Sequence, residues 1–346
     1  MYSVNFVNKI NLDALTNDIK HLIVSDTKVF SLYKDTIFSK VNAEDIILIE
    51  AFEANKTIDT ALDLCRCMAE VSFKRNDVLV SIGGGIIQDV TGFAANIYNR
   101  GVKWTYIPTT LLSQCDSCIG GKTSLNYLNY KNILGTFYAP DKIYIDLNLV
   151  LSLSDDDYRS GLGEVVKFNI IAGSDGIELI EKNIDKLLDR DLPTLRFFLE
   201  RSLDFKKRFI EEDEFDNGVR RQLNFAHTFG HAFETVSQYA IPHGQAVALG
   251  VLIANSISLD RSIMDSYLHD RIYKICRRLI SVEIDSAWFN PDNIIEAMKK
   301  DKKRVSPRLT AVLLNKSNEL EIIEDLEVHE VVNAMSKIYH NFISKS

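Results

Sequence analysis

The first half of the chain alternates short runs rich in Val, Ile and Tyr with longer stretches of helical periodicity, and this alternation restricts the possible folds more than any other feature. Strands buried on both faces of a parallel sheet are apolar along their length, and parallel neighbours need a long crossover, usually a helix. The expected strands are 28–33, 45–51, 77–83, 103–108 and 142–147, with helices over 56–74 and 86–100. We therefore predict an α/β, Rossmann-like parallel sheet.

The second half has a different pattern. From residue 154 onward the chain consists mostly of long amphipathic helical stretches with few candidate strands. Late in the chain, residues 309–315 and 319–325 are expected to form a short hairpin, and a final helix is expected over about 326–343. We therefore expect two domains, a Rossmann-like domain over 1–153 and a mostly α-helical domain over 154–346.

Charge and hydropathy exclude several classes of protein. The 48 acidic and 40 basic side chains give a net charge of −8, which argues against a general nucleic-acid binder. No apolar run reaches the roughly 18 residues of a membrane span, and the N-terminus does not have the pattern of a secretory signal.

The five cysteines are an odd number, which favours reduced thiols and a cytoplasmic protein. Cys115 and Cys118 have C-x-x-C spacing, which is found in redox pairs and also in ordinary tight turns.

Two glycine-containing stretches have the character of anion sites. Gly83, Gly84 and Gly85 connect an expected strand to an expected helix, where free backbone N–H groups favour a phosphate. The spacing is not G-x-G-x-x-G, so a simple tight turn remains an alternative. Asp89 follows in the same helix. Further on, a polar stretch contains Asp116, Lys122, Lys131 and Asn132. Its two lysines are candidates for binding phosphate or carboxylate, and the alternative is that they are solvated surface charges.

The helical half contains a candidate metal site. Three of the seven histidines lie within residues 223–250. His227 and His231 are four apart and share a helical face, His243 stands at an expected helix start, and Glu164 and Lys167 lie three apart among apolar residues. A buried carboxylate needs a partner, and one Glu with two or three His forms a zinc-type site. Packing histidines and an ordinary ion pair are the alternative.

Eight segments in chain order resemble the 3-dehydroquinate synthase family of sugar-phosphate cyclases. They are GGGIIQDVTGFAA, RGVKWTYIPTTLLSQCDS, GGKTSLN, KNILGTFYAP, GLGEVVK, LNFAHTFGHAFE, HGQAVALG and DKK. The resemblance implies a homodimeric lyase of the shikimate pathway that uses NAD and Zn²⁺ or Co²⁺. It implies conversion of 3-deoxy-arabino-heptulosonate 7-phosphate to 3-dehydroquinate and phosphate, by transient oxidation, phosphate elimination, re-reduction and intramolecular aldol closure. It also implies an NAD-binding N-terminal domain and a metal- and substrate-binding helical domain.

The resemblance also implies a role for individual residues. The metal ligands would be Glu164, His227 and His243. The catalytic residues would be Asp116, Lys167, His231 and Asn224. The substrate-binding residues would be Arg100, which would reach the neighbouring subunit's site, Lys122, Asn132, Lys206, Arg220 and Lys303. The cofactor-binding residues would be Glu53, Lys56, Gly83, Gly84, Gly85, Asp89, Thr109, Thr110, Lys131 and Ser152.

The chain departs from the family pattern at positions beside these residues. Phe52, Gln88, Tyr130 and Ala226 each stand where the family usually has Gly, and Gln245 replaces a usual Glu. Tyr130 and Gln88 would place bulk near cofactor and substrate. Two alternatives therefore stay open: a related cyclase with a different substrate, and a metal- and NAD-dependent polyol-phosphate dehydrogenase.

Overall fold

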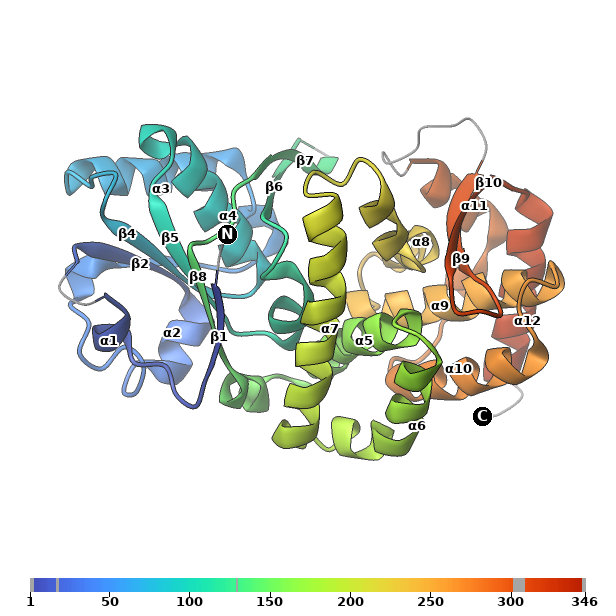
Figure 1. The fold of residues 1–346 in the computed structure, drawn as a ribbon. Coiled ribbons are helices and arrows are strands. Elements are labelled where there is room, and N and C mark those ends of the chain that lie inside the picture. The colour runs from blue at the N-terminus through green and yellow to red at the C-terminus, as the bar shows by residue number, and fades with distance from the viewer. Residues whose placement is uncertain (1–2, 17–18, 129, 301–308, 344–346) are drawn as a thin grey trace. The chain divides into compact units, whose positions relative to one another are not determined.

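A computed structural model of the protein describes residues 3–16, 19–128, 130–300 and 309–343. The chain divides into two compact units, one ending at Leu153 and the other beginning at Ser154 (Figure 1). Each unit has its own core and is described by itself. Within the described ranges, the structure contains no helix whose length and apolar character would let it cross a membrane.

The first unit is built on a parallel sheet, which confirms the predicted α/β class (Figure 1). Its described strands follow the order β1-β8-β5-β4-β2-β3, and every neighbouring pair is parallel. The strands are β1 Ser3–Val7, β2 His21–Asp26, β3 Ile46–Ile49, β4 Val78–Gly83, β5 Lys103–Pro108 and β8 Lys142–Asp146. The central strands are buried along their length, and Ile23, Val80, Ile82 and Ile107 share one core.

One predicted strand of this unit is wrong. Residues 28–33 belong to helix α2 (Thr27–Tyr33), and the strand lies just before it, at β2. The helix begins there because the Asp26 carboxylate accepts a hydrogen bond from the backbone N–H of Lys28, an N-cap contact that ends the strand. The other helices of the unit are α1 Leu12–Thr16, α3 Ile58–Glu70 and α4 Gly85–Ile97. A hairpin of β6 (Lys122–Tyr127) and β7 (Tyr130–Phe137) lies outside the main sheet.

The second unit is mainly helical, as expected, with α9 at its centre (Figure 1). Helix α9 (His243–Asp260) is buried from Gly244 to Ser258 and packs against α5, α8, α10 and α12. A helix that is apolar all round belongs in a core. The other elements are α5 Asp155–Ile171, α6 Ser174–Leu188, α7 Leu192–Glu212, α8 His227–Val236, α10 Ser266–Leu279, α11 Pro291–Lys300, α12 Val328–Ile343, β9 Leu309–Leu314 and β10 Leu320–Leu326. The last two strands form the predicted antiparallel hairpin.

Candidate active site

Three residues from three helices converge at one point of the second unit. Glu164 is fully buried in α5, while His227 and His243 are the first residues of α8 and α9. The Nε2 atoms of His227 and His243 lie 3.3 and 3.4 Å from the same carboxylate oxygen, Oε1 of Glu164. One ligand atom from each residue lies within 4.8 Å of the others, so one metal ion can reach all three. The structure thus brings together the three residues that the family pattern assigns to the metal.

The other ring nitrogen of each imidazole is already engaged. Nδ1 of His227 lies 3.1 Å from the carbonyl oxygen of Phe225, and Nδ1 of His243 lies 3.3 Å from Oε2 of Glu234. Both neighbours are hydrogen-bond acceptors, so they favour a proton on Nδ1 and leave Nε2 available as a ligand. This arrangement, a metal-binding nitrogen with a second acceptor behind it, is typical of histidines that bind metals in proteins.

Lys167 occupies the remaining side of the Glu164 carboxylate. Its Nζ lies 2.7 Å from Oε2 of Glu164, 3.2 Å from the carbonyl oxygen of Leu223 and 4.4 Å from the ring centre of Phe168. Burial opposes ionisation of Glu164, but the charges of Lys167 and His227 prevail and hold the pKa of Glu164 well below its usual range. The carboxylate is therefore ionised, with one oxygen turned to Lys167 and the other to the two imidazoles.

The electrostatics of this cluster fit a divalent cation. Within the described residues, neither oxygen of Glu164 has a hydrogen bond of normal geometry. Burial, assisted by the charge of Lys167, lowers the pKa of His227 to about 4. Burial alone would also lower the pKa of His243, but its contacts with the Glu164 and Glu234 carboxylates prevail and raise this pKa to about 10. Positive charge is thus favoured between the two carboxylates, and one Glu with two His is a zinc-type donor set that leaves a position for substrate.

Glycines allow the three helices to approach closely enough for this convergence. A methyl group on Gly163 would overlap the backbone of Gly244, and one on Gly244 would overlap the carbonyl of Ser160. Gly163 directly precedes Glu164, and Gly244 directly follows His243. The contact of α5 with α9 therefore depends on the absence of two side chains immediately beside two ligands.

A cavity of about 330 Å³ opens beside the metal cluster, within the second unit. His227, His231 and Asn224 line it, so the cavity contains one proposed ligand and two proposed catalytic residues. The segment after α7, helices α8 and α11 and the final hairpin supply the rest of the wall: Asp216, Asn217, Arg221, Thr228, Met298, Leu309, Thr310, Ala311, Val312 and Ile322. This is space for a small polar substrate next to the candidate metal centre.

Two predicted substrate-binding cations of this unit are buried. Lys206 on α7 is 7 % exposed, and Arg220, in the 3₁₀ turn Val219–Asn224, is 4 % exposed. The guanidinium of Arg220 donates to the carbonyl of Glu214, which orients it. Lys303 lies in 301–308, outside the described residues.

Sequence reasoning missed Glu234 and Arg221. Glu234 lies three residues after His231 on α8, a spacing that places both on one helical face and marks it as a candidate partner for a histidine. Arg221, beside the predicted Arg220, contributes to the wall of the cavity. Nothing in its local sequence separates it from a surface arginine.

In the first unit, the glycine turn leads from the end of a strand into the N-terminus of a helix. Gly83 ends β4, Gly84 precedes α4 without a side-chain cap, and a methyl group placed on Gly85 would meet no atom within 4 Å. The backbone N–H of Thr109 donates to the carbonyl of Gly83 at 3.0 Å, and Thr110 packs beside Gly84. Open space beside Gly85 thus adjoins a helix N-terminus, whose first N–H groups favour an anion.

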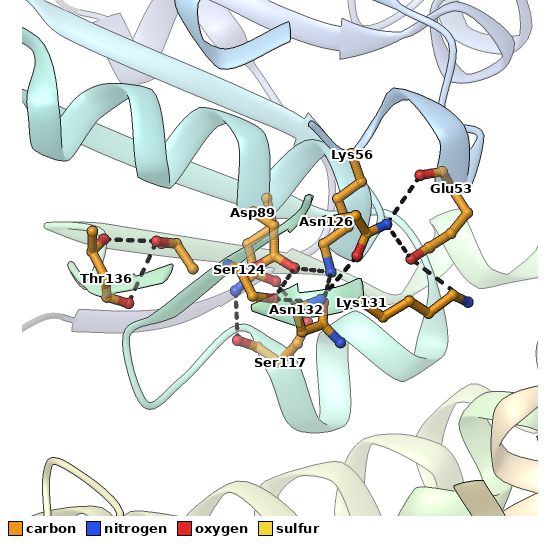
Figure 2. A network of polar contacts seen from close by, with 11 residues as sticks. Glu53, Lys56, Asp89, Ser117, Ser124, Asn126, Lys131, Asn132 and Thr136 are labelled. Atoms are coloured by element: carbon orange, nitrogen blue, oxygen red, sulfur yellow. Dashed lines mark hydrogen bonds and ion pairs between the residues drawn. The ribbon is translucent and has the colours of Figure 1, made fainter. Parts of the chain in front are cut away.

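Other predicted cofactor residues of this unit meet in one polar network (Figure 2). Lys56 is 8 % exposed, and its Nζ lies 2.6 Å from Oδ2 of Asp89 and donates to Oδ1 of Asn132 at 2.7 Å. The backbone N–H of Ser124 donates to Asp89 at 3.0 Å, and the Ser124 hydroxyl lies 3.0 Å from both Asp89 and Asn132. These bonds fasten α4 to the β6–β7 hairpin.

The same network continues to the cofactor residues near Glu53 (Figure 2). Asn126 accepts from the backbone N–H of Asn132 at 2.9 Å and donates to the Glu53 carboxylate at 2.8 Å. Lys131 lies 3.7 Å from that carboxylate. The network therefore joins Asn132, a predicted substrate residue, to predicted cofactor residues.

Asp116, Lys122, Arg100 and Ser152 are the remaining predicted residues of the first unit. Asp116 is in the π-helical turn Ser113–Ser117, and Lys122, exposed, begins β6. Arg100 is exposed and has a positive φ of 58°. Ser152 accepts from the Tyr33 hydroxyl at 2.8 Å and donates to the carbonyl of Leu149. Of the departures from the family pattern, Gln88 is buried and contacts Ser117, whereas Phe52 and Tyr130 are exposed.

The fold is shared with solved structures of two synthases. ValA, the 2-epi-5-epi-valiolone synthase from Streptomyces hygroscopicus subsp. jinggangensis 5008, solved with NAD⁺ and Zn²⁺ bound, matches with a TM-score of 0.87 at 23% identity, covering 99% of this chain and 97% of that one. 2-Deoxy-scyllo-inosose synthase, complexed with carbaglucose-6-phosphate, NAD⁺ and Co²⁺, matches with a TM-score of 0.86 at 22% identity, covering 97% of this chain and 96% of that one. The chain thus has the fold of these two synthases.

Sequence comparison then identifies the family. Residues 46–160 match the model of the 3-dehydroquinate synthase N-terminal region, and residues 161–304 match that of its C-terminal region. The 3-dehydroquinate synthase of Dictyoglomus turgidum is 35% identical over 307 residues, which is 88% of this chain and 85% of that protein. The one from Clostridium tetani is 36% identical over 320 residues, 91% of this chain and 84% of that protein. The chain belongs to the 3-dehydroquinate synthase family, as the sequence resemblance predicted.

Proposed function

We propose that the protein is a 3-dehydroquinate synthase, which converts 3-deoxy-arabino-heptulosonate 7-phosphate to 3-dehydroquinate and phosphate in the shikimate pathway. The observation that carries this proposal is the convergence of Glu164, His227 and His243 beside a cavity lined by His231 and Asn224. The relatives at about one third identity, each named 3-dehydroquinate synthase, support this activity.

The two units have different proposed roles. The unit up to Leu153 binds NAD through the glycine turn and the network around Lys56 and Asp89, and the unit from Ser154 onward binds the metal and much of the substrate. The cofactor residues are Glu53, Lys56, Gly83, Gly84, Gly85, Asp89, Thr109, Thr110, Lys131 and Ser152. The substrate residues are Arg100, Lys122, Asn132, Lys206, Arg220 and Lys303.

The side chains of the second unit would hold the substrate for this chemistry. When bound, NAD supplies and removes a hydride reversibly, and Zn²⁺ or Co²⁺ makes the substrate hydroxyl groups easier to deprotonate. Lys167 would contact these ring hydroxyls, and His231 and Asn224 would orient the substrate from the cavity wall. The buried cations Lys206 and Arg220 would neutralise its negative charge.

One assay tests the proposal. Purified protein, with catalytic NAD and Zn²⁺ or Co²⁺, is mixed with 3-deoxy-arabino-heptulosonate 7-phosphate, and released phosphate, product identity and absorbance of NADH are followed together. We expect one phosphate per 3-dehydroquinate and no lasting NADH, because the hydride is returned. Glu164→Gln should lose this activity, whereas Glu181→Gln, at an ion pair on α6 outside the site, should keep it.

The same assay discriminates between the alternatives. NADH that accumulates in proportion to product would contradict the proposal and identify a dehydrogenase. Phosphate release only from a seven-carbon ketose phosphate without a carboxylate would identify a related cyclase, the alternative that the departures at Gln88 and Tyr130 raise.

We further propose a cytoplasmic homodimer in which Arg100 completes the neighbouring subunit's substrate site. The exposure of Arg100, in the 3₁₀ turn Tyr98–Arg100 that follows α4, supports this role, because its side chain is available to a second copy. Light scattering of the purified protein should give twice the mass of one chain. A monomer that is fully active would contradict this part of the proposal.

A further inference from the structure

Glu234 lies behind the candidate metal centre and has no assigned role. It is on α8, seven residues after His227, and its side chain is 14 % exposed. Its Oε2 lies 3.3 Å from Nδ1 of His243, while Nε2 of the same ring faces Glu164. His243 therefore lies between two carboxylates, each directed at a different ring nitrogen.

The two candidate histidine ligands are anchored by different groups. His227 has a backbone carbonyl, that of Phe225, behind its Nδ1, whereas His243 has a carboxylate side chain. A carboxylate is the stronger acceptor because it is charged, and it makes the imidazole a more basic ligand. It also comes from another helix, so it joins the end of α8 to the start of α9.

We propose that Glu234 is a positioning residue that fixes the orientation and tautomer of the His243 ring and so strengthens metal binding without itself touching the ion. This inference rests on the proposed metal site. Outer partners of this kind typically change metal affinity by about 10- to 100-fold when they are removed.

Glu234 also belongs to a second possible ligand group, with His231 and His243. An ion bound there would make Glu234 a ligand instead of a hydrogen-bond acceptor for His243. The group around Glu164 is the better site, because its carboxylate is completely buried while the members of the other group are all partly exposed. A buried carboxylate gains most from a cation.

The test is metal affinity, measured by competition between the full-length protein and a chelator for Zn²⁺ and Co²⁺. Glu234→Gln keeps the shape of the side chain and removes its charge, and Glu181→Gln removes a charge from α6 that is paired with an arginine outside the site. We expect Glu234→Gln to bind either metal about 10- to 100-fold more weakly than wild type, with one ion per chain, and Glu181→Gln to be unchanged. The Co²⁺ absorption spectrum should shift in Glu234→Gln only.

Several outcomes would overturn the inference. Equal affinities of wild type and Glu234→Gln would mean that Glu234 does not position the ligand. Two ions per wild-type chain and one in Glu234→Gln would mean that Glu234 is a ligand. Failure of the wild type to bind metal would instead overturn the proposed function.

A second measurement needs no variant and so does not depend on how Glu234→Gln folds. Nitrogen NMR of the Zn²⁺-loaded wild type should show His243 with a proton on Nδ1 and the metal on Nε2. The opposite assignment would contradict the inference.

Discussion

The roles of the three neighbouring histidines depend on which ring nitrogen of each is available. His227 and His243 have acceptors behind Nδ1 and direct Nε2 at Glu164. His231 lines the adjacent cavity and belongs to the other possible ligand group. The i,i+4 spacing of His227 and His231 alone would favour that pair as ligands, but the shared carboxylate oxygen pairs His227 with His243.

Substitution of single histidines should therefore separate metal binding from turnover. We expect His243→Ala to lose one of three ligands and to retain less than a tenth of the metal after gel filtration. His231→Ala should retain its metal and lose turnover. Elemental analysis and the phosphate-release assay measure the two properties, and the reverse pattern would refute the ligand assignment.

Ala226 is strained where the family usually has glycine. It has a positive φ of 69° directly before His227, and its side chain is buried. The left-handed conformation costs a non-glycine residue about 1–2 kcal/mol, whereas a glycine costs about 0.5–1 kcal/mol in the unfolded chain. We expect Ala226→Gly to raise the free energy of unfolding by up to about 1 kcal/mol, measured by denaturant titration. A clear loss of stability would mean that the methyl group packs better than its backbone strain implies.

At the scale of elements, the metal site is a consequence of how closely α5, α8 and α9 approach. Gly163 and Gly244 permit the contact of α5 with α9, and a methyl group on Gly250 would overlap the carbonyl of Ala226 at the start of α8. Gln245, buried next to Gly244, accepts hydrogen bonds from the backbone N–H groups of Ser281 and Val282. The glutamine that replaces the family's usual glutamate therefore fastens α9 to the segment after α10.

Enlargement of one of these glycines should open the site. In Gly244→Ala the new methyl group meets the Ser160 backbone, which cannot move as a flexible side chain can. We expect a loss of about 1–3 kcal/mol of stability and at least tenfold weaker metal binding, since His243 moves with α9. Gly85→Ala is the control in the other unit, because its methyl group meets no neighbour, and it should leave metal binding unchanged. Unchanged metal affinity in Gly244→Ala would contradict this role for the close helix contact.

At the scale of the whole molecule, the sequence predicted best those elements whose apolar residues recur with a regular spacing. The parallel-sheet class, the helical second half and the final hairpin were predictable because buried strands and amphipathic helices have distinct patterns. The strand at His21–Asp26 was not predictable, because polar residues flank its short apolar centre and the following helix is rich in residues that are common in strands. The order of the strands and the partner of His243 were also beyond reach, because both depend on contacts between distant segments.

The proposed sharing of sites between two copies predicts complementation. Arg100→Ala and Glu164→Gln should each be inactive, because one removes a substrate cation from the neighbour's site and the other removes a metal ligand. Mixed dimers have one site with both residues intact, so unfolding and refolding the two variants together should restore about a quarter of wild-type activity at equal amounts. This fraction follows from half of the dimers being mixed, each with one intact site. No recovery, with mixed dimers present by mass spectrometry, would place Arg100 in its own subunit's site or outside the site.

The central claim is that one cation binds between Glu164, His227 and His243. The most direct measurement is an anomalous-scattering map at the zinc edge from crystals of the Zn²⁺-loaded protein. We predict one strong peak, at bonding distance from the Glu164 carboxylate and the Nε2 atoms of both histidines, about 2.0–2.2 Å. A peak between His231 and Glu234, or no peak within reach of Glu164, would contradict the account.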